Sequence, residues 1–159
     1  MKSELEIIGV EGALRLIRPS RIYKCSYLRA QAEGEFGIEG EQVRWFNIGT
    51  TIDAMAENPV RRVFWLVNGK DFIGEVSVTC LEMPVAPITY YCIRESQRGR
   101  GFATVMLRLL LPYLKELGYS VANLWIYHKN LASRKVAERN GAVADATDPS
   151  INIHYDIKL

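Results

Sequence analysis

Histidine and cysteine are scarce in this chain of 159 residues, and their spacing fits neither a metal site nor a disulfide framework. The two histidines, His128 and His154, are far apart in the sequence. The three cysteines, Cys25, Cys80 and Cys92, are an odd number without paired spacing. Zinc sites need closely spaced ligands, and disulfide frameworks need paired thiols. We therefore expect no metal, and we expect a reducing compartment, the cytoplasm.

Long apolar runs and a large excess of one charge are also missing. No segment is long and apolar enough to span a bilayer, and the first residues lack the pattern of a signal peptide. A formal net charge of +2 is too small for binding nucleic acid through a broad basic face. We expect one domain over residues 1–159, with neither membrane nor nucleic acid as a partner. The sequence does not fix the assembly state, and a homodimer is one option.

The middle of the chain reads as an antiparallel meander, preceded by a short strand and two helices. Asn68-Gly69 between two β-rich runs is a strong hairpin signal. Alternation places Glu75 on one face of its strand and Val76 on the other. We expect residues 83–87 to be a connector. The segments predicted are strands over residues 13–18, 62–67, 72–80 and 88–94, and helices over about 21–32 and 51–57.

From Phe102 onward the apolar period becomes helical. We predict a helix over 102–117, with a kink or break at Pro112, and then a buried strand over 121–127. Strand, helix and strand in this order indicate a right-handed parallel crossover. A helix over 131–140 capped by Asn130 and a closing strand over 151–158 complete a mixed α/β (α+β) chain.

The stretch from Ser96 to Thr104 joins a strand to a helix and interleaves two glycines with two arginines. Helix N-termini offer unpaired N–H groups, and glycine lets a ligand approach the backbone, so a phosphate site is predicted. The dinucleotide fingerprint fails at its third glycine, where Thr104 stands, and no Gly-Lys-Ser/Thr run is present. A solvated polar loop is the alternative interpretation.

Two motifs at the correct separation carry a family resemblance. Arg98-x-x-Gly101-x-Ala103 is followed by Asn130-Leu131-Ala132-Ser133 and then by Gly141. This pattern resembles the acetyl-CoA motifs of the GCN5-related N-acetyltransferase (GNAT) family. Two positions depart from the family pattern: Ala137 stands where a tyrosine is common, and Ala142 where an aromatic is usual.

The resemblance implies a GNAT-like, mostly antiparallel twisted sheet with a central parallel splayed strand pair, flanked by about four helices. Residues 13–87 would form the acceptor side and the meander, and residues 88–142 the acetyl-CoA-binding core. The strands over 88–94 and 121–127 would splay and admit pantetheine. No metal is implied.

The cofactor contacts implied by the resemblance come from the end of one strand, the loop after it and the Asn130 helix. A backbone N–H near Cys92 or Ile93 would polarise the thioester carbonyl, and the side chain of Asn130 would hold pantetheine. Arg94 and Arg100 would serve the 3′-phosphate or only the surface. The full set is Cys92, Ile93, Arg94, Arg98, Gly99, Arg100, Gly101, Phe102, Ala103, Thr104, Asn130 and Ser133.

The implied chemistry is direct attack on acetyl-CoA, in a ternary complex, by a primary amine of a small molecule or a peptide. We favour Glu75 as general base, with Tyr90, His128 or a water relay as rivals and a solvent-facing strand residue as the plain alternative. For the acid we favour Ser133, which could instead satisfy a backbone N–H in the first turn of its helix. Tyr155 is a distant candidate.

Two other functions are compatible with the sequence. One is a non-catalytic acyl-CoA-binding or sensor module on the same fold, which the missing tyrosine keeps open. The other is a general anion- or nucleotide-binding α/β domain, which the failed glycine patterns disfavour. Trp45 and Phe46 either line an acceptor pocket or fill the core.

Overall fold

The computed structural model describes residues 5–34, 47–79, 84–145 and 151–159. Trp45 and Phe46, expected at an acceptor pocket or in the core, lie outside these residues, as does Cys80. Within the described ranges, no helix is long and apolar enough to cross a bilayer.

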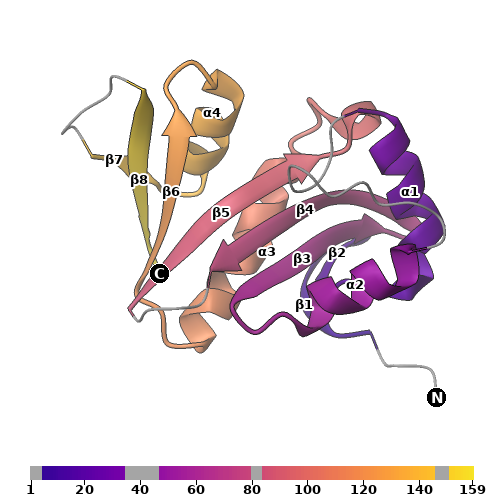
Figure 1. The fold of residues 1–159 in the computed structure, drawn as a ribbon. Coiled ribbons are helices and arrows are strands. Elements are labelled where there is room, and N and C mark those ends of the chain that lie inside the picture. The colour runs from indigo at the N-terminus through magenta and orange to yellow at the C-terminus, as the bar shows by residue number, and fades with distance from the viewer. Residues whose placement is uncertain (1–4, 35–46, 80–83, 146–150) are drawn as a thin grey trace.

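The described strands form one eight-stranded sheet in the order β1-β2-β3-β4-β5-β6-β8-β7. Among them only the β5–β6 pair is parallel, and every other neighbouring pair is antiparallel. This confirms the expected mixed, mostly antiparallel sheet (Figure 1). The strands are β1 (Ile7–Glu11), β2 (Leu14–Ile17), β3 (Arg61–Asn68), β4 (Asp71–Thr79), β5 (Val85–Ile93), β6 (Val121–Tyr127), β7 (Val143–Ala144) and β8 (Asn152–Lys158).

Turn chemistry explains the hairpins of the meander. The β3–β4 hairpin is confirmed at Asn68-Gly69, where Gly69 has φ of +57°. The β1–β2 hairpin turns at Gly12, with φ of +59°. Both values lie in the left-handed region that glycine adopts without strain. Neither β1 nor β7 was predicted; each is a short outermost strand, so its sequence lacks a clear buried/exposed alternation.

Helices cover both faces of strands β2 to β4, as Figure 1 shows. The far face packs on α3 (Phe102–Glu116), through buried residues that include Met106, Leu110 and Leu114. The near face packs on α1 (Lys24–Ala32), which follows a 3-10 turn (Arg21–Tyr23), and on α2 (Ile48–Glu57). Because both faces are covered, β4 is buried from Phe72 to Val78. A fully buried Leu or Phe contributes about 1.5–3 kcal/mol.

Pro112 does not break α3. The helix continues from Phe102 to Glu116 through the proline. Pro112 lies on the exposed side of the helix, where water can bond to the carbonyl that the proline leaves unpaired. Leu117, the last residue of the predicted helix, is 36% exposed and follows the end of α3.

Strand β5, the first strand of the splayed pair, begins earlier in the chain than predicted. Residues 85–87, expected to be a connector, are the first part of β5 and are the residues that pair with β6. The ladder ends where Pro87 faces Asn123, because proline has no N–H to continue it. Beyond that point β5 and β6 diverge, so the expected splay is confirmed (Figure 1).

Candidate active site

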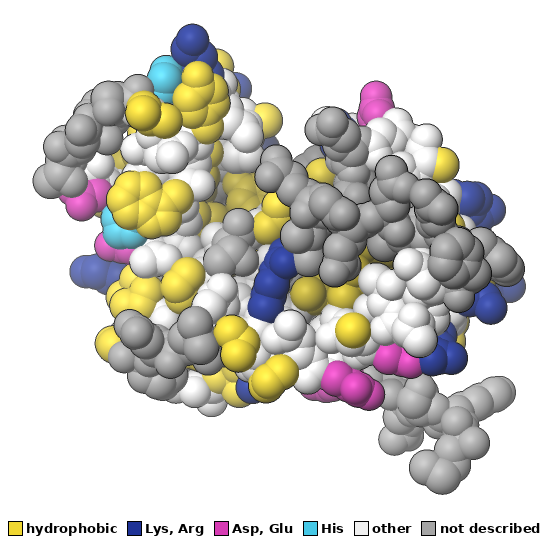
Figure 2. Space-filling view, in the orientation of Figure 1, with side chains coloured by type: hydrophobic (Ala, Val, Ile, Leu, Met, Phe, Trp, Pro, Cys, Tyr) yellow, Lys and Arg dark blue, Asp and Glu magenta, His cyan; other side chains and the backbone are white. Residues whose placement is uncertain are grey.

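A cavity of about 140 Å³ lies between the diverging strands β5 and β6. Figure 2 shows the surface hollowed between the β6 side of the molecule and the α1 side. Aromatic and polar side chains share the lining with aliphatic ones. The lining residues are Ile88, Tyr90, Tyr91, Leu124, Trp125, Ile126, Tyr127, Asn130 and Ser133.

Backbone alternation decides which β5 amides face this cavity. The N–H of Arg94 donates to the carbonyl of Ile73 on β4 (2.9 Å), and Cys92 pairs with Glu75 in the same ladder. Since successive residues of a strand point their backbone groups to opposite sides, the amides of Tyr91 and Ile93 face the open edge. The carbonyl of Ile93 accepts from Arg98 Nε (2.9 Å), which agrees with that orientation. Of the two amides expected at the thioester, that of Cys92 faces β4 and that of Ile93 faces the opening.

The loop before α3 offers a row of unpaired amides. Gly99 and Gly101 have φ of +74° and +80°, and Gly101 is the N-cap of α3. Within the described residues, nothing accepts from the N–H groups of residues 99–103. Such a curved row of donors at a helix N-terminus is a concave anion site. The amides of Arg98 and Thr104 are already bonded to the carbonyls of Glu95 and Gly101, so only their side chains stay available.

The arginines around this loop have different roles. Arg100 is exposed, its Nη1 donates to Gln97 Oε1 (2.5 Å), and its guanidinium lies 5.1 Å from the centre of the Phe102 ring. Arg94 is 9% exposed and forms an ion pair with Glu33, the residue directly after α1. Its Nη1 also donates to the carbonyl of Phe72 (3.2 Å). The side chain of Arg94 therefore ties the end of α1 to the sheet, and its expected contact with the 3′-phosphate stays a prediction.

This assignment of Arg94 gives a test. The pKa of Glu33 is lowered to about 2, chiefly by the hydrogen bond from Arg94, so the pair is charged at neutral pH. Arg94→Gln should lower stability by about 2–3 kcal/mol, because a partly buried carboxylate loses its partner. That loss corresponds to a fall in melting temperature of roughly 4–12 °C. If Arg94 has only this structural role, the acetyl-CoA dissociation constant stays within about twofold by calorimetry, and a loss of affinity of tenfold or more would place Arg94 at the phosphate site.

Helix α4 (Leu131–Arg139) borders the other side of the cavity. Asn130 is its N-cap, and its Oδ1 accepts from the N–H of Ser133 (3.1 Å), which confirms the predicted cap. Because the Asn130 oxygen is used in this way, its Nδ2 is the group left to face a ligand. At the other end of α4, Asn140 Nδ2 donates to the carbonyl of Thr104 (3.3 Å) and fixes α4 to α3.

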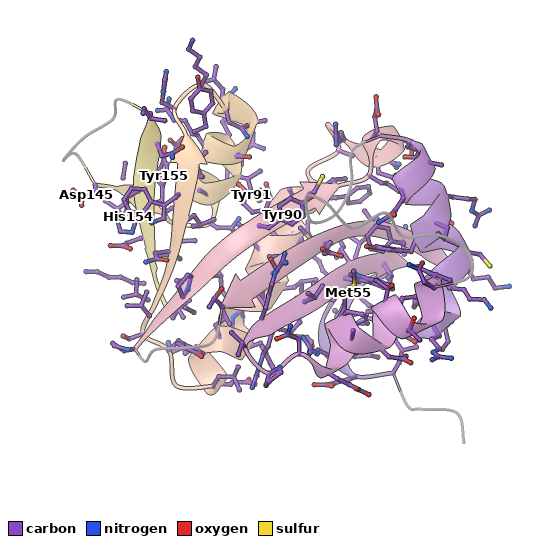
Figure 3. All side chains as sticks on the ribbon, viewed as in Figure 1. Met55, Tyr90, Tyr91, Asp145, His154 and Tyr155 are labelled. Atoms are coloured by element: carbon purple, nitrogen blue, oxygen red, sulfur yellow. The ribbon has the colours of Figure 1, made fainter. Side chains whose placement is uncertain are left out.

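Three hydroxyl-bearing side chains stand near the first turns of α4. Ser133 lines the cavity, and Asn130, not the Ser133 hydroxyl, caps the first turn. Tyr91 extends from β5, and its hydroxyl donates to the carbonyl of Ser133 (3.0 Å). Tyr155 on β8 is 1% exposed, and its hydroxyl accepts from Arg134 (3.1 Å) and donates to Glu138 (3.2 Å). Figure 3 shows both tyrosines. The side chain of Tyr91 was missed in the sequence, although alternation along β5 placed it beside Ile93.

Glu75 on β4 is fully buried. Its Oε2 accepts from Trp65 Nε1 (2.9 Å), while Oε1 has no hydrogen-bond partner among the described residues. Burial raises the pKa of this carboxyl from 4.5 to about 7. The alternative interpretation, in which Glu75 is a solvent-facing strand residue, is therefore wrong. Its cross-strand neighbour is Cys92, one strand away from the cavity.

The rival bases lie at different places. Tyr90 lines the cavity, whereas His128 follows β6, with its Nδ1 3.0 Å from the carbonyl oxygen of Ile151. Nowhere in the described parts of the chain do three His, Cys, Asp or Glu side chains gather as a metal site would require.

Comparison with known proteins agrees with this geometry. The model of the acetyltransferase (GNAT) domain family matches residues 29–143. No curated protein sequence matches the chain. Among solved structures, RimL, named a ribosomal L7/L12 α-N-protein acetyltransferase, has a TM-score of 0.78 at 16% identity, covering 98% of this chain and 95% of RimL.

Two further structures share the fold. MccE, the microcin C7 self-immunity acetyltransferase solved with acetyl-CoA and AMP, has a TM-score of 0.77 at 15% identity, with 96% and 97% of the two chains covered. A putative ribosomal-protein-serine acetyltransferase from Vibrio cholerae has a TM-score of 0.73 at 17% identity, with both chains covered over 100%. The sequence match and the splayed-strand architecture together show that this chain belongs to the GNAT acetyltransferase family.

Proposed function

We propose that this chain transfers the acetyl group of acetyl-CoA to a primary amine, by direct attack within a ternary complex. The observation that supports this most is the open edge of β5. Two backbone amides, those of Tyr91 and Ile93, point to this open edge, and Tyr91 lines the cavity together with Asn130. Pantetheine is an extended chain with amide groups, so it can pair with such an edge as an added strand.

Acetyl-CoA would be held at three places along this path. Its pyrophosphate would accept from the amides of residues 99–103, with Arg98 and Arg100 adjoining. Its pantetheine would lie against Tyr91 and Asn130. Its thioester carbonyl would accept from the N–H of Ile93, which would stabilise the negative charge that develops there.

The reaction needs a proton removed from the amine and a sulfur that can leave. An alkylamine has a pKa of roughly 10, so the attacking amine must first lose a proton. Glu75 is the proposed base, since a carboxyl with a pKa of about 7 is well suited to accept a proton near neutral pH. The C–N bond then forms and the C–S bond breaks, with the electron pair remaining on sulfur. The candidate that the sequence motif offers for the acid assisting the leaving sulfur is Ser133, which lines the cavity.

The acceptor class is supported only in general terms. RimL is named an α-N-protein acetyltransferase and MccE a self-immunity acetyltransferase, so the fold alone does not fix the acceptor. We propose an amine of a peptide or a small molecule, bound mainly by residues 13–87, with residues 88–142 as the cofactor core. The single-domain organisation, the cytoplasmic location and the homodimer option stay predictions.

Two measurements, made one after the other, test the proposal. Calorimetric titration should show binding of acetyl-CoA but not of ATP or NAD, and a preference for either nucleotide would reject the proposal. A screen of amino acids, polyamines, aminoglycosides and peptides, followed by release of the CoA thiol, should then find an acceptor. Tight acetyl-CoA binding with no turnover on the whole panel would instead support the sensor function.

A further inference from the structure

The cavity wall contains a hydroxyl that the family motif does not assign. Tyr91 comes from β5, crosses to the first turn of α4 and donates to the carbonyl of Ser133 (3.0 Å). It lines the cavity with Asn130, and its ring packs against the main core. Figure 3 shows Tyr91 on β5, with Tyr155 on β8. The two hydroxyls thus approach α4 from different strands.

We propose that the Tyr91 hydroxyl is the hydrogen-bond donor to the sulfur that leaves when acetyl-CoA is cleaved. This inference rests on the proposed function and replaces Ser133 in that role. Ala137, where the family has its tyrosine, is fully buried and carries no hydroxyl. Tyr91 would therefore bring a phenol to the inner side of α4 from the opposite strand.

The hydrogen-bond pattern favours Tyr91 over the other two hydroxyls. The proton of Tyr155 is directed to the Glu138 carboxylate, and its ring is enclosed in the core. Ser133 has the shorter side chain and lies in the helix itself. In the described part of the chain, the Tyr91 hydroxyl donates to the neutral backbone carbonyl of Ser133, and both residues line the cavity. A thiolate is a stronger acceptor than a carbonyl, because hydrogen bonds to charged groups are roughly twice as strong.

The electrostatics keep this phenol protonated. Burial raises the pKa of Tyr91 above 10, and the nearby phenol of Tyr155 raises it further, while the bond to Ser133 lowers it. Arg134 and Glu138 of α4 are charged groups on this side, and both are bonded to Tyr155. Tyr91 is therefore a neutral donor throughout the accessible pH range.

The step balances without any additional reactant. As the C–S bond breaks, its electron pair remains on sulfur, and the Tyr91 O–H turns from the Ser133 carbonyl to that sulfur. A thiol has a pKa of about 8.5, lower than that of Tyr91, so the sulfur stays a hydrogen-bonded thiolate. It takes its proton from water when CoA leaves.

The pKa of the thiol of bound CoA reports the hydrogen bond from Tyr91, and its measurement needs no acceptor amine. The ultraviolet absorbance of the thiolate is measured against pH for CoA bound to the full chain. The same protein with desulfo-CoA is the reference, and subtracting it removes the absorbance of the protein's own cysteines. We expect the pKa of the bound thiol to lie about one unit below that of free CoA, because a donor stabilises the thiolate. Tyr91→Phe, which keeps the ring, should abolish the shift, and Ser133→Ala should retain it. A shift that persists in Tyr91→Phe, or that disappears in Ser133→Ala, overturns the inference.

Turnover gives a second measurement with the acceptor found in the screen. Tyr91→Phe should lower kcat about 10- to 100-fold, with the KM of the acceptor and the affinity for acetyl-CoA nearly unchanged. Thermal unfolding of the variant checks that it is folded. If the wild type does not bind acetyl-CoA, the proposed function fails and this inference fails with it. If acetyl-CoA binds and Tyr91→Phe equals the wild type in both measurements, only this inference fails.

Discussion

Gly101→Glu should lower the affinity for acetyl-CoA by at least about 100-fold, which is roughly 2.7 kcal/mol. Gly101 has φ of +80° and is the N-cap of α3, so its backbone shapes the row of amides that would hold the pyrophosphate. A glutamate there adds a negative charge next to a diphosphate and strains the left-handed backbone. A Cβ at this position would meet nothing within 4 Å, so the helix itself has room to fold. Calorimetry with acetyl-CoA measures the effect.

A matched variant separates loss of the site from loss of the fold. Gly12 also has a positive φ, of +59°, and a Cβ there would likewise meet nothing within 4 Å. It lies in the β1–β2 hairpin, away from the candidate site. Gly12→Glu should bear the same backbone strain and the same charge, and should bind acetyl-CoA as the wild type does. If both glutamate variants bind equally well, the row of amides is not the pyrophosphate site.

Glu75→Gln should lower kcat by about 100-fold and leave the affinity for acetyl-CoA unchanged, because general-base catalysis contributes 10²–10⁴-fold. The wild-type rate should rise with pH through about 7, where Glu75 loses its proton. The variant should lack this rise. A variant with wild-type turnover, or one that keeps the same rise, would transfer the base role to Tyr90, His128 or water.

The same substitution should change stability in a way that depends on pH. The pKa of Glu75 is raised on folding from 4.5 to about 7, so the folded chain holds a proton that the unfolded chain releases between these values. Stability from this group is therefore full below about pH 4.5 and is lost as the pH rises through 7. One pKa unit is about 1.4 kcal/mol, so the loss is on the order of 3 kcal/mol. Gln cannot ionise, and Glu75→Gln should therefore melt higher relative to the wild type at pH 8.5 than at pH 5.

Local sequence signals were enough to predict the helices and turns that border the candidate site. Asn68-Gly69 predicted the β3–β4 hairpin, and Asn130 predicted the start of α4, because turns and caps depend on a few adjacent residues. The glycines of residues 99–101 predicted a strand-to-helix turn with open amides. Even the family resemblance rested on two short motifs, and the match over residues 29–143 agrees with it.

Some local signals were misleading because a contact far along the chain outweighed them. Residues 85–87 carry Pro87 and resemble a connector, but β6 supplies a parallel partner for them. Arg94 has a partner that its neighbours in the sequence do not indicate, because the end of α1 places Glu33 beside it. Alternation placed Glu75 on one face of its strand and left a solvent-facing position as an alternative, whereas α1 and α2 cover that face of the sheet.

By itself the sequence determined the order and type of the main elements, the helix N-terminus that would face a phosphate and the family, because each depends on residues close together in the chain. Only the tertiary structure decided that Ile93 and not Cys92 turns its amide to the open edge of β5, that Glu75 is buried, and that Tyr91 reaches α4. These features depend on strand register and on packing between segments tens of residues apart. Burial and register arise only when such segments meet, and for that reason the chemistry of the candidate site could not be predicted from adjacent residues alone.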